Sequence, residues 1–193
     1  MGRGLRGRIY DYRLGWLLLL LLVGNLQAGE RERLLQRAEQ GDREAQYRLG
    51  ERYFEGTEGA VDYGQAMYWW RMAARQKDPR AQNGIGTLYD NGKGVAKDYH
   101  EAAKWFRLAA NQGHLMARRN LGWMHEKGQG FPVDLVKAYQ WQYLAEMSRN
   151  RHASLSHPIP CPLCDKLAPH MTPQQIEQAM LQAIHWQRED GEE

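Results

Sequence analysis

The stretch DPRAQNGIGTLYDNGKGVAKDYHEAAKWFRLAANQG, residues 78–113, is the middle one of three copies of a single pattern. Comparing the chain with itself at an offset of 36 residues returns small and aromatic residues in register. The three sets are Ala45, Gly50, Tyr53, Ala66, Trp69 and Ala73, then Ala81, Gly86, Tyr89, Ala102, Trp105 and Ala109, then Ala117, Gly122, His125, Ala138, Trp141 and Ala145. A fixed period of this length predicts a stacked repeat protein.

Each copy carries the signals of two antiparallel helices joined by a turn. In residues 78–113, Asp78 followed by Pro79 predicts a helix start. The glycine-containing run at 91–94 then predicts the break between the helices. Asp98 is the expected cap of the second helix, and Glu101 completes a capping-box pattern with it. The repeats therefore predict an all-α chain with unit boundaries at 42–77, 78–113 and 114–150.

Recurring glycines and aromatic residues give a packing prediction. Gly50, Gly86 and Gly122 fall inside helices, where glycine costs about 1 kcal/mol relative to alanine. We infer that a side chain at these positions would clash with the neighbouring helix. The large aromatic residues on the periodic stripe are expected in the core rather than on a ligand platform; these are Trp69, Trp70, Trp105, Phe106 and Trp141.

The ends of the chain depart from the repeat. Residues 29–41 match the end of a second helix and predict an N-terminal capping helix. Residues 151–171 are rich in proline, cysteine and histidine and are predicted to form a loop. Thr172, Pro173 and Gln175 form a helix-start signal, followed by an apolar stripe at Ile176, Met180, Ile184 and Trp186. Residues 172–193 are thus predicted to be a C-terminal capping helix with a frayed tail.

Residues 1–28 have the pattern of a signal peptide. Four arginines precede a leucine-rich core at 14–23, and Ala28 supplies a cleavage site. The apolar core is about half the length that crosses a bilayer, so an uncleaved N-terminal anchor is the alternative. Cleavage predicts a periplasmic or secreted protein. Retention predicts an inner-membrane anchor facing the periplasm, with membrane contact through this segment alone.

The basic charge of the chain belongs to this N-terminal segment. The formal net charge is +3, from 26 basic and 23 acidic residues. Without the four arginines and one aspartate of residues 1–28, the chain has 22 residues of each sign. A near-neutral chain of this kind excludes nucleic-acid binding through phosphate neutralisation.

Residues 30–148 resemble the Sel-1-like repeats, which are relatives of tetratricopeptide repeats. The matching features are the helix that carries Ala81, Ile85 and Tyr89, the Gly-x-Gly turn, the Asp-Tyr pair and the Ala-x-x-Trp-Phe helix of residues 81–113. The resemblance implies a right-handed α-solenoid with a concave face, built between two capping helices. It implies an adaptor role without a shared catalytic site. We therefore expect a non-enzymatic scaffold, without a cofactor, that binds a protein or peptide in the bacterial envelope.

Four tyrosines that are expected to be less securely buried than the periodic aromatic residues are candidates for the partner-binding groove. They are Tyr47, Tyr63, Tyr68 and Tyr99.

Cys161 and Cys164 are the sharpest chemical candidates in the chain. In an oxidising compartment, two cysteines this close predict a disulfide that fixes local shape. A zinc site that adds His157 and His170 as ligands is a second interpretation. A redox-active pair is the third. The last two would make the protein a metal-dependent or redox-active accessory rather than a scaffold alone.

Overall fold

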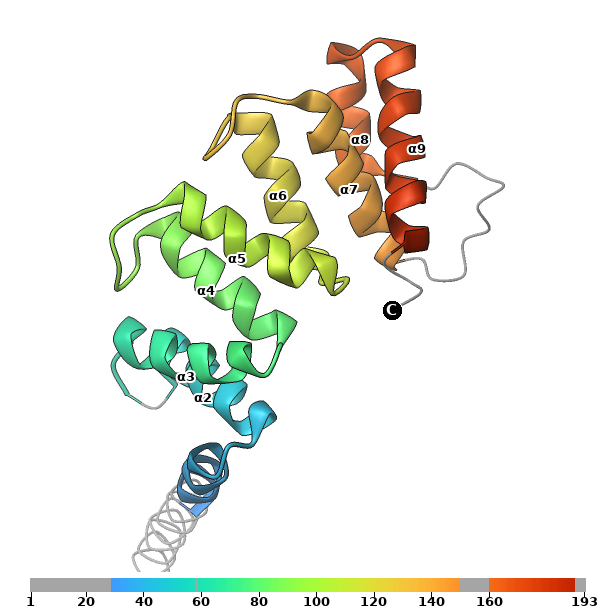
Figure 1. Cartoon of the computed structure of the whole chain (residues 1–193). Coiled ribbons are helices and arrows are strands. Elements are labelled where there is room, and N and C mark those ends of the chain that lie inside the picture. The colour runs from blue at the N-terminus through green and yellow to red at the C-terminus, as the bar shows by residue number, and fades with distance from the viewer. Residues whose placement is uncertain (1–28, 58, 150–159, 190–193) are drawn as a thin grey trace, which may run out of the picture.

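A computed structural model describes residues 29–57, 59–149 and 160–189 (Figure 1). The described residues form helices and turns without a strand, and no helix among them is long and apolar enough to cross a membrane. Three helix pairs follow one another along the stack: α2 (Arg43–Glu55) with α3 (Tyr63–Arg75), α4 (Pro79–Asn91) with α5 (Tyr99–Asn111), and α6 (Leu115–Lys127) with α7 (Leu135–Arg149). The predicted all-α solenoid is confirmed.

Capping elements close the two ends of the array. Residues 29–39 are helical, and Ala38 is buried against Leu49 and Trp69 of the first pair. At the other end, α9 (Pro173–Glu189) packs against α7. The predicted start of α9 is confirmed: the backbone N–H of Thr172 donates to the side-chain oxygen of Gln175, and the backbone N–H of Gln175 donates to the Thr172 hydroxyl.

Aspartates begin most of the helices. The Asp78 carboxylate accepts the N–H groups of Arg80 and Ala81, and Pro79 opens α4 as predicted. Asp98 caps α5 by accepting the Glu101 N–H at 3.0 Å. The reciprocal half of the expected capping box is not formed, because the Asp98 N–H donates to the Tyr89 carbonyl and the Glu101 carboxylate pairs with Lys104.

The third repeat uses a histidine as its cap. His114 stands where the other two repeats have Asp42 and Asp78, and its Nδ1 accepts the Ala117 N–H at 3.3 Å. Burial lowers the pKa of His114 below its ordinary value, with a smaller opposing effect from Asp78. Because Nδ1 must be unprotonated to accept this hydrogen bond, the cap depends on a neutral imidazole.

As predicted, the glycines of the first helices leave space into which a side chain of the second helix packs. We call each of these contacts a glycine seat. A Cβ at Gly86 would lie 2.6 Å from the Phe106 ring, and a Cβ at Gly122 would lie 2.7 Å from the Gln142 amide. Gly50 is in the same relation to Trp70. In each repeat, the residue that packs on the glycine is therefore the one directly after the tryptophan that recurs every 36 residues. The expected core aromatics are buried, except for Trp105, which is partly exposed.

A buried polar link repeats in register beside the glycine seats. The Gln76 amide donates to Gln46 at 2.8 Å, and the Gln112 amide donates to Gln82 at 2.7 Å. The third repeat replaces the pair by Arg118 and Ser148, which are also hydrogen bonded. Each link joins a first helix to the residues that end the second helix of its own repeat. The three links lie at the same place in their repeats. Because each is a specific hydrogen bond, it fixes the position of the two helices of its repeat relative to each other.

The predicted loop at 151–171 is wrong for its second half. Residues 162–170 form the helix α8 (Pro162–Leu167) and a 3₁₀ turn, η1 (Ala168–His170). Pro162 occupies the first helical turn and Cys161 is the N-cap, while Cys164 and Leu167 are buried against the core of the last repeat. A six-residue helix of this kind is stabilised by packing rather than by its own propensity, so its composition resembles that of a loop.

The C-terminal apolar stripe also differs in detail from the prediction. Ala179 and Ala183 are fully buried against the array. Ile176, Met180 and Ile184 are only partly buried beside them. The two alanines allow α9 to approach α7 closely, and the larger residues fill the flanks of that contact.

Replacing Gln46 by methionine tests the buried polar link. Gln46 is 1% exposed and donates to the Ala38 carbonyl at 3.0 Å while accepting from Gln76. Methionine keeps the length but leaves that carbonyl without its donor, so the free energy of unfolding falls by about 1–3 kcal/mol in urea titration. The control Arg48→Met, which removes only an exposed ion pair with Glu44, costs about 0.5 kcal/mol. Equal losses in the two variants would contradict the role of the link.

His114→Asp tests the pH dependence of the third-repeat cap. In the unfolded chain His114 binds a proton as pH falls through its ordinary pKa, whereas the folded pKa is lower. The native protein therefore loses the cap contribution, about 1 kcal/mol, between neutral pH and pH 5. The aspartate variant keeps its cap over this range, because its carboxyl titrates near pH 4. Parallel stability curves for the two proteins from pH 7 to 5 would refute this assignment; the other histidines cancel in the comparison.

Candidate binding surfaces

The first helices of the three repeats lie side by side and form one continuous surface. Helix α2 contacts α4, and Arg80 of α4 donates to Glu44 of α2 at 2.6 Å. Asn120 of α6 donates to Asn83 of α4 at 3.1 Å. We call the outward side of α2, α4 and α6 the first-helix face.

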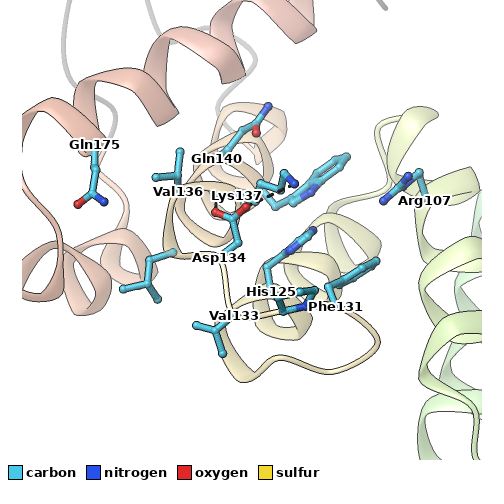
Figure 2. A pocket seen from close by; sticks show the side chains of 12 residues that line it. Arg107, His125, Phe131, Val133, Asp134, Val136, Lys137, Gln140 and Gln175 are labelled. Atoms are coloured by element: carbon cyan, nitrogen blue, oxygen red, sulfur yellow. Dashed lines mark hydrogen bonds and ion pairs between the residues drawn. The ribbon is translucent and has the colours of Figure 1, made fainter.

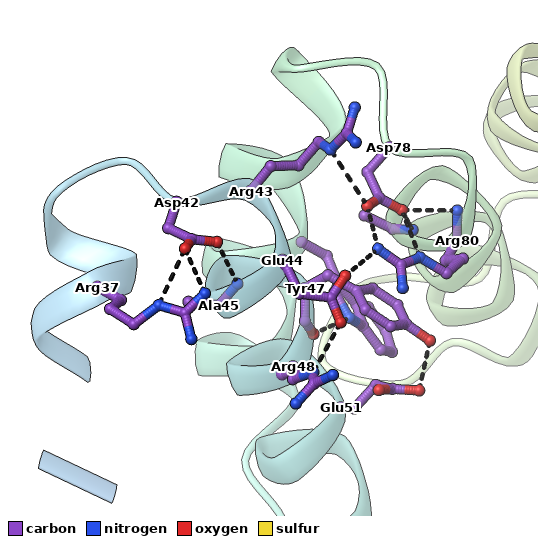
Figure 3. Close-up of polar contacts among 12 residues, drawn as sticks. Arg37, Asp42, Arg43, Glu44, Ala45, Tyr47, Arg48, Glu51, Asp78 and Arg80 are labelled. Atoms are coloured by element: carbon purple, nitrogen blue, oxygen red, sulfur yellow. Dashed lines mark hydrogen bonds and ion pairs between the residues drawn. The ribbon is translucent and has the colours of Figure 1, made fainter. Parts of the chain in front are cut away.

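Ion pairs hold the N-terminal part of this face in place (Figure 3). Arg80 pairs with Asp78 and Glu44, and its guanidinium lies 4.1 Å from the centre of the Tyr47 ring. Burial alone would raise the pKa of Asp78, but hydrogen bonds from Arg80 and from the Ala81 N–H outweigh it and hold that pKa below its ordinary value. The network orders long side chains at the junction of two repeats.

The C-terminal part of the face carries two exposed apolar side chains. On α6, Met116 is 49% exposed and Trp123 is 52% exposed. The two residues lie two helical turns apart and therefore point to the same side. The Lys127 amine lies 4.7 Å from the centre of the Trp123 ring. Trp123 was not among the residues predicted to bind a partner. Comparison of the repeats would have singled it out, because the equivalent positions hold Glu51 and Thr87.

The four predicted groove tyrosines are not brought together. Tyr47 lies on the first-helix face under Arg80, and burial followed by its hydrogen bond to Glu51 raises its pKa. Tyr63 begins α3 and packs against Gly94 in the turn of the next repeat. Tyr99 has the same relation to Gly130 one repeat later.

The remaining tyrosine of that set, Tyr68, is exposed on the second helix α3. It lies edge-on to Trp69, with ring centres 5.0 Å apart. Tyr63 and Tyr99 thus join successive repeats through their turns, and Tyr47 alone of the four lies on the first-helix face.

A separate cleft of about 690 Å³ lies beside the third repeat (Figure 2). Arg107 of α5 borders it on one side and Gln175 of α9 on the other. The wall between them comes from the end of α6, the following loop and the start of α7. It consists of His125, Phe131, Pro132, Val133, Asp134, Leu135, Val136, Lys137, Gln140 and Trp141.

His125 is the buried polar residue of this cleft. Its side chain is stacked on Phe131 with ring centres 4.3 Å apart, and the residue is 4% exposed. Its Nδ1 is buried and has no hydrogen-bond partner in the described part of the chain. Burial, followed by the charge of Lys137, lowers the pKa of His125, so the ring is neutral at pH 7.

The two cysteines lie at the start of α8 and are joined by a disulfide. Their Cα atoms are 5.1 Å apart, Cys161 is 4% exposed and Cys164 is fully buried. His157, one ligand of the zinc interpretation, lies outside the described residues. Within the described ranges, no group of three or more His, Cys, Asp or Glu side chains could hold a metal ion.

The fold defines a helical-repeat protein built from three stacked helix pairs. The model of the Sel1 repeat matches residues 43–78, 79–114 and 115–145, more than half of the chain. The chain belongs to the Sel1 repeat family, whose members are typically non-enzymatic scaffolds for protein–protein interaction.

Two solved structures share the fold. A Sel1 repeat protein from Oxalobacter formigenes is 37% identical over 62% of this chain and 94% of its own, with a TM-score of 0.53. The second is c5321, described as a protective antigen present in uropathogenic Escherichia coli strains displaying an SLR fold. It is 26% identical over 93% of this chain and 45% of its own, with a TM-score of 0.54.

A curated relative matches a shorter part of the sequence. The secretory immunoglobulin A-binding protein EsiB of Escherichia coli O6:H1 is 46% identical over 57 residues. The match covers 30% of this chain and 11% of EsiB. The chain therefore spans about a tenth of the length of this relative.

Proposed function

We propose that this protein is an exported, non-enzymatic scaffold whose first-helix face binds a segment of a partner protein. The observation that carries the proposal is Trp123, a half-exposed tryptophan beside Met116 on α6. Tryptophan is the residue type most enriched among the side chains that dominate binding energy in protein interfaces.

The repeat supplies an internal control for Trp123. The equivalent residues on α2 and α4 are Glu51 and Thr87, and both helices take the same place in their repeats. The fold therefore does not need an aromatic side chain at this position. Trp123 and Met116 together offer an apolar contact of the kind that a partner's apolar side chain covers, next to the polar side chains of α2 and α4.

The face is ordered before any partner arrives. Arg80, Asp78 and Glu44 are fixed to one another, and Asn120 is fixed to Asn83. A partner that docks there does not have to order these long side chains, so less binding energy is lost on association.

The export part of the proposal is supported by the sequence of residues 1–28, which has the pattern of a signal peptide. The Cys161–Cys164 disulfide is of the kind that persists in an oxidising compartment. Two relatives are described by their encounters with a host: EsiB binds secretory immunoglobulin A, and c5321 is a protective antigen. We place the present protein in the periplasm or outside the cell on this basis.

We assign a structural role to the disulfide. Both cysteines are at the start of α8 and are buried in the same core cluster as Leu167 of α8 and Tyr139 of α7. A redox-active pair has to meet a reductant through an accessible sulfur. The burial of both residues favours a bond that fixes the start of α8 over a metal-dependent or redox-active accessory function.

Site-specific photo-cross-linking tests the role of the first-helix face. A benzophenone amino acid replaces Thr87, on α4 beside the proposed contact, in cells that make the full-length protein. A discrete adduct is expected in the periplasmic or medium fraction. Trp123→Thr, which copies the residue of the preceding repeat, reduces that adduct roughly 30-fold, since a central tryptophan contributes about 2 kcal/mol.

The matched control is Tyr68→Thr, which removes an aromatic side chain of similar exposure, 53%, from the second helix α3. It leaves the adduct unchanged, and circular dichroism verifies that both variants remain helical. An adduct that is indifferent to Trp123→Thr, or that Tyr68→Thr reduces equally, would overturn the assignment of the face. An adduct confined to the cytoplasm would overturn export.

A further inference from the structure

The second repeat has residues equivalent to Arg107 and His125 of the cleft, and there the two side chains are hydrogen bonded to each other. Arg71 of α3 is equivalent to Arg107 of α5, and Tyr89 of α4 is equivalent to His125 of α6. In the second repeat the Arg71 guanidinium donates to the Tyr89 hydroxyl at 3.1 Å. The third repeat has an imidazole in place of the phenol, so that hydroxyl acceptor is missing.

Arg107 consequently has no hydrogen bond or ion pair with any of the described residues. His125 is in the same condition: Nδ1 is sealed without a partner, and Nε2 makes no hydrogen bond to the described part of the chain. The stack on Phe131 holds the ring in one plane. Buried polar groups in folded proteins are nearly always hydrogen bonded. Nδ1 is sealed from the cleft, whereas Nε2 is not, so Nε2 is the ring nitrogen that a molecule in the cleft can reach.

The fold does not require a histidine at this position. The backbone carbonyl of His125 accepts the Asp134 N–H at 3.0 Å, and the Tyr89 carbonyl accepts the Asp98 N–H at the same distance. This backbone bond is the same whichever side chain is present. The exchange of a tyrosine for a histidine therefore changes the cleft and leaves the helix–turn–helix connection intact.

A second exchange makes the cleft cationic. Lys137 of α7 stands where the second repeat has Glu101. Its amine lies 3.4 Å from Asp134, and that carboxylate also accepts the Lys137 N–H as the cap of α7. The charged groups that line the cleft are two cations, Arg107 and Lys137, and one carboxylate, Asp134, so their charges sum to one positive charge.

Apart from Gln140 and Gln175, the rest of the lining is apolar. Phe131 and Val136 form part of the wall between α6 and α7, and Trp141, 9% exposed, continues it on α7. A cleft of about 690 Å³ has the size of a small-ligand or side-chain site. One excess cation beside aromatic and aliphatic walls suits an anion that carries an apolar group.

We propose that this cleft binds a carboxylate attached to an apolar side chain, with Arg107 and the His125 Nε2–H as its donors. Guanidinium groups match carboxylates with two parallel hydrogen bonds, and a neutral imidazole supplies one more. Phe131, Val136 and Trp141 cover the apolar part. The C-terminal residue of a peptide and an acidic side chain next to an apolar one both present this chemistry. The site is independent of the first-helix face.

The test titrates the purified protein with N-acetyl-L-phenylalanine and with N-acetyl-L-phenylalaninamide, followed by NMR of the His125 and Trp141 ring signals. The acid binds with a Kd in the range of about 1 mM and shifts both rings, and the amide binds at least roughly tenfold more weakly because it lacks the charge. N-acetyl-aspartyl-phenylalaninamide, which carries only a side-chain carboxylate, shows which source of the carboxylate fits better. Sodium acetate binds more weakly than either acid, since it lacks the apolar group.

Three variants locate the binding. Arg107→Gln reduces affinity for the acid at least roughly tenfold, and Arg71→Gln, the matched arginine of the second repeat, leaves it unchanged. His125→Tyr restores the residue of the second repeat, which recaptures Arg107 and abolishes binding. Because Arg107 is at the surface, its variant remains informative even if His125→Tyr alters folding.

Several results would overturn the proposal. They are equal affinity for the acid and the amide, equal affinity for acetate, equal effects of the two arginine variants, or no shift of the His125 ring with ligand at about 20 mM. Each of these leaves the cross-linking result at the first-helix face unaffected, so the two proposals fail separately.

Discussion

The contact between a helix glycine and the residue that follows twenty positions later determines how each helix pair closes. At Gly86 the missing side chain lets the Phe106 ring lie where a Cβ would otherwise be, 2.6 Å from it. Trp70 is seated between two such glycines, Gly50 on α2 and Gly84 on α4, and so it joins two repeats. Dispersion contacts between the ring and the helix that lacks a side chain there are individually weak but add up over an aromatic ring. The helix spacing they impose sets the positions of the first-helix face and of the cleft.

With the scaffold held in this way, differences between equivalent positions become informative. The seat glycines recur in all three units, whereas the glutamine links and the aspartate caps of the first helices recur in the first two and are replaced in the third by Arg118 with Ser148 and by His114. Where the third repeat departs from its neighbours without a packing reason, the change falls on a surface: Thr87 becomes Trp123 on the first-helix face, and Tyr89 becomes His125 in the cleft. A repeat protein thus contains its own reference for separating structural residues from residues that meet a partner.

Sequence reasoning predicted those parts of the fold that local chemistry determines. Asp78 with Pro79, the turn glycines and the Thr172 capping box act within a few residues, and each helix begins or ends where they predict. The glycine seats were predictable because the cost of glycine in a helix recurs three times. Helix α8 was missed because a short helix depends on burial against α7 that composition does not reveal.

The binding surfaces were harder to predict than the fold, because the turns of the next repeat cover some side chains and leave others exposed to solvent. Tyr63 and Tyr99 lie under the turns of the following repeats, whereas Trp123 has no such cover. Among the described residues, Arg107 and His125 have no hydrogen-bond partner because the bond that joins Arg71 to Tyr89 has no counterpart in the third repeat, and only the structure shows that bond. Once the structure of the second repeat is known, the replacement of Tyr89 by His125 in the third repeat predicts that Arg107 loses the equivalent hydrogen bond.

The most direct test of the account is a double-mutant cycle at the central seat. We predict that Gly86→Ala lowers the free energy of unfolding by about 1–3 kcal/mol through overpacking, although alanine favours helices by about 1 kcal/mol. With Phe106→Leu in the background the same alanine is better tolerated, and the coupling energy is about 1 kcal/mol or more. Stabilisation by Gly86→Ala, or additive losses from the two substitutions, would contradict the claim that the glycine seat sets the helix spacing.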